Sequence, residues 1–184
     1  MSFFKSLPAD AGPADVFTTY PAIYSLWAKM SQALMNGPSP LSQAERELIL
    51  AYAAGVAGCR FVYVAHSEVA YAWGIERGLL DALLADPDAA PVEPRLKPLL
   101  AYVRKLAVSP GEMSQADADA VFAAGWDEHA LHDAVAVTAR AAFMQRLVEG
   151  HGFTPMSREA AADRARRRLE HGYVALYPAF RESP

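Results

Sequence analysis

Residues 41–74 read LSQAERELILAYAAGVAGCRFVYVAHSEVAYAWG and contain the single cysteine of the chain, Cys59. Ser42 followed by Glu45 is a capping box, which predicts that a helix begins near Gln43. Two glycines weaken this helix just before the cysteine, and the helical pattern resumes after it until a final glycine. The stretch therefore predicts two helices that join close to Cys59.

Cys59 lies at the predicted N-terminus of the second helix, where unpaired amides and the helix dipole favour a thiolate. His66 lies two turns along the same helix face, roughly 10 Å away by helical rise, so the two side chains need a bridging group to interact. Glu47 adds a carboxylate from the preceding helix. Thiol, imidazole and carboxylate are the groups that thiol chemistry requires, so we expect Cys59, His66 and Glu47 to be the catalytic residues.

The spacing of these residues resembles that of the alkylhydroperoxidase-D-like proteins of the carboxymuconolactone decarboxylase superfamily. The pattern there is Glu, eleven residues, Cys, two residues, Cys, three residues, His, and here it reads Glu47, Cys59, Val62, His66. In the peroxidases of that family the second cysteine attacks the peroxide and the first resolves it as a disulfide. The resemblance implies a proton relay of Glu47 and His66 with a resolving-type Cys59, while Val62 stands at the attacking position.

The resemblance extends to residues 20–153, through the segments GPSPLS, SPGEMSQADADAVFAAGW and DAVAVTARAAF. These segments are similar to the peroxidase-related branch of the superfamily. The resemblance implies an all-helical fold that assembles as dimers, trimers or hexamers.

Length and composition favour one soluble domain over residues 1–184. Hydrophobic residues make up 53% of the chain and charged residues 21%, and the net charge of −4 favours neither nucleic acid nor an anionic membrane as partner. The N-terminus lacks the apolar core of a signal peptide, and the longest uncharged run falls well short of the ~20 residues of a membrane span. A single cysteine excludes an intramolecular disulfide. We expect a cytoplasmic protein without a cofactor or metal.

Helical spacing of apolar residues and many alanines predict an all-α fold. Residues 127–149 form the longest apolar stretch, which predicts either the central helix of the domain or an oligomer contact. The last helix carries a run of arginines that we interpret as a solvated face or as charges near the helix C-terminus. The apolar tail at residues 173–180 is expected to dock on the rest of the chain. The arginines of the run are Arg164, Arg166, Arg167 and Arg168.

Two classes of function follow. The first is an enzyme, either an antioxidant protein in which Cys59 alone reduces a hydroperoxide and an external thiol regenerates it, or a decarboxylase-type enzyme that uses His66 without a cysteine. The second is a non-catalytic helical homo-oligomer that keeps the fold and has lost the dithiol chemistry. The sequence names no substrate.

Overall fold

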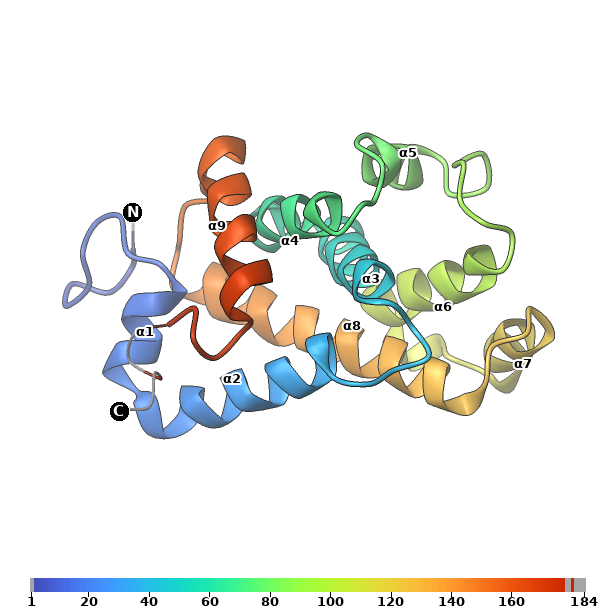
Figure 1. Cartoon of the computed structure of the whole chain (residues 1–184), viewed down its shortest axis with the longest axis horizontal. Coiled ribbons are helices and arrows are strands. Elements are labelled where there is room, and N and C mark those ends of the chain that lie inside the picture. Colours follow the sequence, from blue (N-terminus) through green and yellow to red (C-terminus); the bar gives the residue numbers. More distant parts are fainter. Residues whose placement is uncertain (1, 178–179, 181–184) are drawn as a thin grey trace.

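A computed structural model of the chain describes residues 2–177 and residue 180, and within these residues the fold consists of helices without any strand (Figure 1). The prediction of an all-α fold is confirmed. None of the helices in the described part of the chain is long and apolar enough to cross a membrane. The elements are α1 (Pro13–Thr19), α2 (Pro21–Asn36), α3 (Gln43–Val56), α4 (Arg60–Ala72), α5 (Leu79–Ala85), α6 (Leu96–Val108), the 3₁₀ turn η1 (Pro110–Glu112), α7 (Gln115–Ala123), α8 (Glu128–Gly150) and α9 (Arg158–His171).

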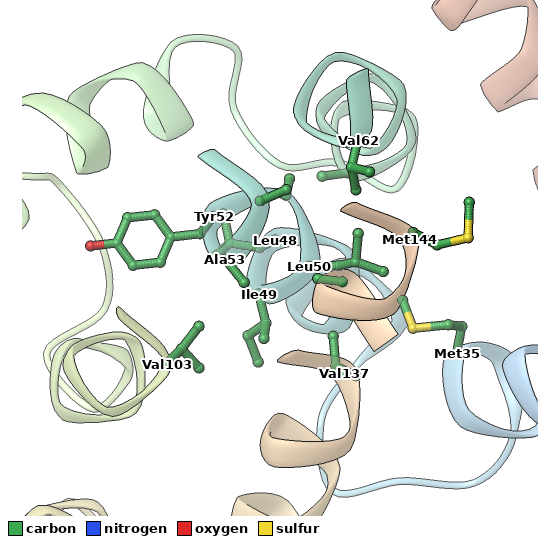
Figure 2. Close-up of a cluster of buried hydrophobic side chains, with 14 of the residues drawn as sticks. Met35, Leu48, Ile49, Leu50, Tyr52, Ala53, Val62, Val103, Val137 and Met144 are labelled. Atoms are coloured by element: carbon green, nitrogen blue, oxygen red, sulfur yellow. The ribbon is translucent and has the colours of Figure 1, made fainter. Parts of the chain in front are cut away.

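Helix α3 is the centre of the domain. Every residue from 46 to 54 is buried, which requires neighbours on all sides of the helix. Helices α4, α5, α6 and α8 supply them. Figure 2 shows the side chains of α3 among Val62 of α4, Val103 of α6 and Val137 of α8.

Helix α8 is buried along one side only, so it is not the central helix of the domain, and the alternative that residues 127–149 form an oligomer contact stays a prediction. Ala134, Val137 and Ala141 face the core, whereas Ala139 and Phe143 are exposed. Alanine exposes little apolar area, so a stretch rich in alanine looks more hydrophobic than the surface it needs to bury. Helix α8 contacts α4, but α4 packs far more extensively against α3 and α9.

The start of α3 and its connection to α4 both form as the sequence predicts. The Ser42 hydroxyl accepts from the Glu45 amide at 3.2 Å, and the Glu45 carboxylate accepts from the Ser42 amide at 2.7 Å. Gly58 then adopts a φ of 76°, a left-handed conformation that suits glycine, and Cys59 is the N-cap of α4. This tight turn sets α3 and α4 side by side.

Helix α9 packs against α4, and the chain then turns back towards α2 (Figure 1). Gly172 makes the turn with a φ of 68°, at a point where a Cβ atom would clash with Oε1 of Gln32. The next amide, that of Tyr173, donates to the same oxygen at 2.6 Å. Tyr173, Tyr177 and Phe180 are buried, so the predicted docking of the tail is confirmed for the described residues, with positions 178 and 179 outside them.

Candidate functional site

Glu47 and His66 meet in the core between α3 and α4. The His66 Nδ1 atom lies 2.7 Å from Oε2 of Glu47, and the two residues are 2% (Glu47) and 5% (His66) exposed. A carboxylate accepts only, so His66 carries its proton on Nδ1 and donates it to Glu47. This tautomer leaves Nε2 of the imidazole as an acceptor.

Tyr173 and Arg168 complete the surroundings of the pair. The Tyr173 hydroxyl donates to the second carboxylate oxygen, Oε1 of Glu47, at 2.5 Å. Nη1 of Arg168 lies 3.3 Å from Nε2 and 3.5 Å from Nδ1 of His66, so it is nearly equidistant from both nitrogens. The same Nη1 donates to the Tyr173 hydroxyl at 3.3 Å. Glu47 is thus fixed through both oxygens, and a cation lies beside the imidazole.

A second buried arginine, Arg140 of α8, stacks on Tyr173 from another side. Its guanidinium carbon lies 4.7 Å from the centre of the Tyr173 ring and 4.9 Å from that of Trp27. Its Nε donates to the Ser31 hydroxyl at 3.1 Å. Aromatic faces attract a desolvated guanidinium, and these contacts hold the tyrosine that holds Glu47.

Burial and charge fix the protonation states of the pair. Burial raises the pKa of Glu47, but His66, Arg168 and the Tyr173 hydroxyl outweigh it, so this pKa lies below its usual value and the carboxylate is ionised. Burial lowers the pKa of His66 to about 4 against the attraction of Glu47, and Arg168 and Arg140 lower it further. At neutral pH His66 is therefore an uncharged base.

Cys59 lies apart from this pair. Its side chain is 1% exposed and lines a small pocket between α3, α4 and α5 with Gly58, Tyr63 and Leu84. Burial raises the pKa of the thiol to about 11, although the Val62 and Phe61 amides lower it. Glu149 raises it further, by a hydrogen bond and by its charge. Burial outweighs the helix N-terminus, and the thiol is protonated at neutral pH.

His66 instead lines a cavity of about 180 Å³ between α4, α8, α9 and the segment before α1. Val62, one turn before His66 on α4, lines it too. The position at which the family pattern has its attacking cysteine therefore faces the cavity, and Cys59 does not. The remaining lining residues are Asp10, Ala11, Gly12, Pro13, Ala14, Phe61, Ala65, Met144, Thr154, Met156, Arg164, Arg168 and Tyr177.

The arginine run of α9 is only partly the solvated face that the sequence predicts. Arg166 and Arg167 are exposed, but Arg168 is 7% exposed and touches His66, and Arg164 is half-buried in the cavity wall. Residues 161, 165 and 168 form the face of α9 that packs on the core. In the sequence, the helical spacing of Ala161, Ala165 and Arg168 is the signal that this face is buried.

The structure has the alkylhydroperoxidase-D-like fold, which solved structures of other proteins share. A peroxidase-related protein with an alkylhydroperoxidase AhpD core from Ralstonia eutropha JMP134 superposes with a TM-score of 0.71 at 22% sequence identity, over 77% of this chain and 75% of that one. A peroxidase-related protein from Silicibacter sp. TM1040 gives a TM-score of 0.68 at 21% identity, over 83% of this chain and 91% of that one. At these identities the likeness concerns the fold. No protein-family model and no curated protein sequence matches the chain.

Proposed function

We propose that the protein is an enzyme of the alkylhydroperoxidase-D-like superfamily whose catalytic group is the His66–Glu47 pair. The observation that carries this proposal is the 2.7 Å hydrogen bond between Nδ1 of His66 and Oε2 of Glu47 beside a cavity that Cys59 does not line. The reaction is proton transfer to and from a small substrate, as in the decarboxylase-type chemistry that the sequence resemblance includes. It requires no thiol.

The neutral imidazole supports both halves of such a reaction. His66 removes a proton from the substrate through Nε2, and Glu47 stabilises the imidazolium that forms. The pKa of His66, lowered to about 4 by burial, makes that imidazolium a strong acid, which returns the proton to the product readily. Tyr173 acts as a positioning residue because it holds the second oxygen of Glu47.

Deuterium exchange at carbon tests this proposal with a panel of candidate substrates. The protein is incubated in D₂O with small carbon acids, including β-keto acids and carboxylated lactones, and the label at carbon is followed by NMR. We expect exchange or turnover of at least one compound that His66→Gln abolishes and Cys59→Ser leaves intact. Activity that is lost in Cys59→Ser and kept in His66→Gln would refute the proposal.

Reduction of hydroperoxides by Cys59 is the second candidate function. It is favoured by the two structural neighbours, which are described as peroxidase-related, and by the place of Cys59 at the start of α4. In that reaction the thiolate attacks one peroxide oxygen, the O–O bond breaks, the other oxygen leaves as the alcohol, and Cys59 becomes a sulfenic acid. Two equivalents of an external thiol then return it to the thiol and release water and a disulfide. Consumption of cumene hydroperoxide with a thiol reductant, lost in Cys59→Ser, would establish it. If the protein is inactive in both assays, the non-catalytic alternative takes their place.

We further propose that the chain forms a homo-oligomer through the outer face of α2. The apolar residues at 127–149 and in the tail at 173–180 are a sequence feature that favours self-association of the chain. The described residues of the tail, however, are buried in the chain's own core. Five of the eight large apolar side chains that are exposed in the described part of the chain lie on α2, at its N-cap or next to it on α8: Tyr20, Ile23, Leu26, Met30 and Phe143. Contiguous apolar patches of this kind mark interfaces.

Light scattering of the Leu26→Asp variant tests this interface. Leu26 is 67% exposed, so the substitution leaves the core intact and places a charge in the centre of the patch. We expect wild type to have the mass of an oligomer and Leu26→Asp to shift towards the monomer. Val108→Asp, at an apolar residue that is 52% exposed on α6, is the matched control and should behave as wild type. A monomeric wild type contradicts the proposal.

A further inference from the structure

Three buried or half-buried arginines lie in or near the wall of the cavity beside His66, and two of them, Arg164 and Arg168, line it. Arg168 and Arg140 are 7% and 3% exposed, and Arg164 lies half-buried in the cavity wall next to Arg168. Burying a guanidinium is expensive unless a negative group pairs with it. These arginines therefore require a negatively charged partner.

Glu47 does not form an ion pair with any of them. Its Oε2 accepts from His66 and its Oε1 from Tyr173. Among the described residues, no carboxylate oxygen lies within 4.0 Å of a nitrogen of Arg140, Arg164 or Arg168. Among the described residues, the cavity lining therefore has two guanidiniums, those of Arg164 and Arg168, and one carboxylate, that of Asp10.

Arg168 also has an unused donor. Its buried Nε has no hydrogen-bond partner among the described residues. Buried polar atoms without a partner are rare in folded proteins, and this one belongs to a side chain that lines the cavity. Arg164, one turn earlier on the same helix, lines the same cavity and supplies a second guanidinium.

The rest of the cavity wall is mostly apolar. Phe61, Val62 and Met144 lie opposite or beside the arginines, and Figure 2 shows Val62 and Met144 reaching from α4 and α8 at the edge of the core. Asp10 is exposed, so its charge is screened by water. A space of about 180 Å³ accepts a small molecule with one charged end and one apolar end.

We infer that this cavity binds a small monocarboxylate, with its carboxylate on Arg164 and Arg168 and its apolar part against Val62 and Met144. The inference deepens the proposed function and rests on it, because it names the class of substrate that His66 would act on. A carboxylate held by the arginines leaves its neighbouring carbon atoms towards the imidazole that Arg168 touches. Arg164 and Arg168 are then the residues that select an anion.

Calorimetric titration of the protein with propionate and with propionamide tests the inference. The two probes have nearly the same shape and differ in charge, so the comparison isolates the arginines. We expect propionate to bind with a dissociation constant on the order of 1 mM and propionamide at least about tenfold more weakly. Inorganic phosphate, which offers charge without an apolar end, should also bind more weakly than propionate.

Substitutions at α9 locate the site. Arg164→Gln should weaken propionate binding about tenfold or more, and Arg164→Lys should restore part of it. Arg167→Gln removes the same charge from an exposed position of the same helix, and its affinity should match wild type. Circular dichroism of each variant checks that the fold is kept.

Three outcomes overturn the inference: equal binding of propionate and propionamide, tighter binding of phosphate, or unchanged affinity in Arg164→Gln. His66→Gln separates this inference from the proposed function. If His66→Gln binds propionate with the affinity of wild type but performs no proton exchange, both the anion site and the proposed function are supported. Proton exchange that survives in His66→Gln refutes the proposed function and leaves the anion site to be judged by binding alone.

Discussion

The N-cap of α4 and the middle of the same helix differ in what burial does to the reactive group they carry. Cys59 at the N-cap and His66 two turns later are both nearly inaccessible, at 1% and 5% exposure. Burial favours the uncharged form of each, so the pKa of the thiol rises to about 11 and that of the imidazole falls to about 4. An uncharged thiol is unreactive, whereas an uncharged imidazole is a base. Burial therefore suppresses the thiolate at Cys59, and at His66 it keeps the imidazole uncharged while weakening it as a base.

The largest effect should come from removing the carboxylate that the arginines and His66 share. Glu47→Ala leaves Arg168 and Arg140 buried without a nearby negative charge, which should destabilise the protein by about 3–5 kcal/mol. Urea denaturation followed by circular dichroism measures this loss. Glu76→Ala, at an exposed glutamate, is the control and should stay within about 0.5 kcal/mol of wild type. Equal losses in the two variants would show that Glu47 has no special role.

The contrast between the position of Cys59 and the cavity wall at Val62 predicts that thiols at these two positions differ in their rate of alkylation. With its pKa raised from 9.0 to about 11, Cys59 should react with iodoacetamide roughly 100-fold more slowly at neutral pH than an unperturbed cysteine. In the Cys59→Ser background, Val62→Cys places a thiol on the cavity wall near His66 and the arginines, and it should react at least about tenfold faster than Cys59.

Mass spectrometry of the time course provides both rates. With both cysteines present, Val62→Cys also creates a pair three residues apart in the first turn of α4, which should form a disulfide under mild oxidation. A rapid reaction of Cys59 in the folded wild type would reverse the comparison and favour the peroxidase candidate.

Acid should destabilise the protein through His66. Because the pKa of His66 is lowered to about 4 in the folded state, the unfolded chain binds more protons between pH 6.5 and 4. Its contribution to stability is therefore complete above pH 6.5 and is lost as the pH falls towards 4, by about 3 kcal/mol in total. Glu47, whose pKa is also lowered, adds a loss of the same sign at lower pH.

Urea denaturation at several pH values measures the slope of the free energy of unfolding against pH. His66→Gln should reduce it between pH 6.5 and 4, although the variant is less stable at neutral pH. His129→Gln, at a histidine on the exposed side of α8, should keep the slope of wild type. An NMR titration that finds His66 protonated at pH 7 would contradict the direction of the shift.

The smallest effect on stability is expected from removing a tyrosine hydroxyl, and its size should depend on whether that hydroxyl has a hydrogen-bond partner. Tyr173→Phe removes the donor to Oε1 of Glu47 and should cost about 1–2 kcal/mol. Tyr52→Phe removes a buried hydroxyl that has no partner among the described residues, so it should be neutral or stabilising. Thermal melting of the two variants compares them directly. The site would be less organised than we describe if both variants lost the same stability.

The sequence predicted the helices and half of the site. The capping box at Ser42, the glycines before Cys59 and the apolar spacing after it were local signals, and α3 and α4 formed where they indicated. The contact of Glu47 with His66 followed from a family spacing within these two neighbouring helices. The role of Cys59 as a catalytic residue stays a prediction.

The other half of the site was missed because its residues come from distant parts of the chain. Arg168 and Tyr173 reach His66 and Glu47 across 102 and 126 residues of sequence, and no local pattern reports such a contact. Arg168 stands in a charged run, which by composition indicates a solvent-exposed face. Its spacing from Ala161 and Ala165 places it on one face of α9, but the packing of α9 on α4 is needed to show that this face is buried.

The turn at Gly172 has a consequence for the order in which this molecule assembles. During synthesis, α3 and α4 emerge together and can pair early, whereas Tyr173 is anchored to Gln32 only after α9 has left the ribosome. Until then Glu47 and His66 stay hydrated, with pKa values near those of free side chains. Docking of the last helix therefore lowers the basicity of His66 and keeps its imidazole uncharged. Transient undocking of α9 in the mature protein would return the site to that early state, and amide hydrogen exchange in α9 would report how often this happens.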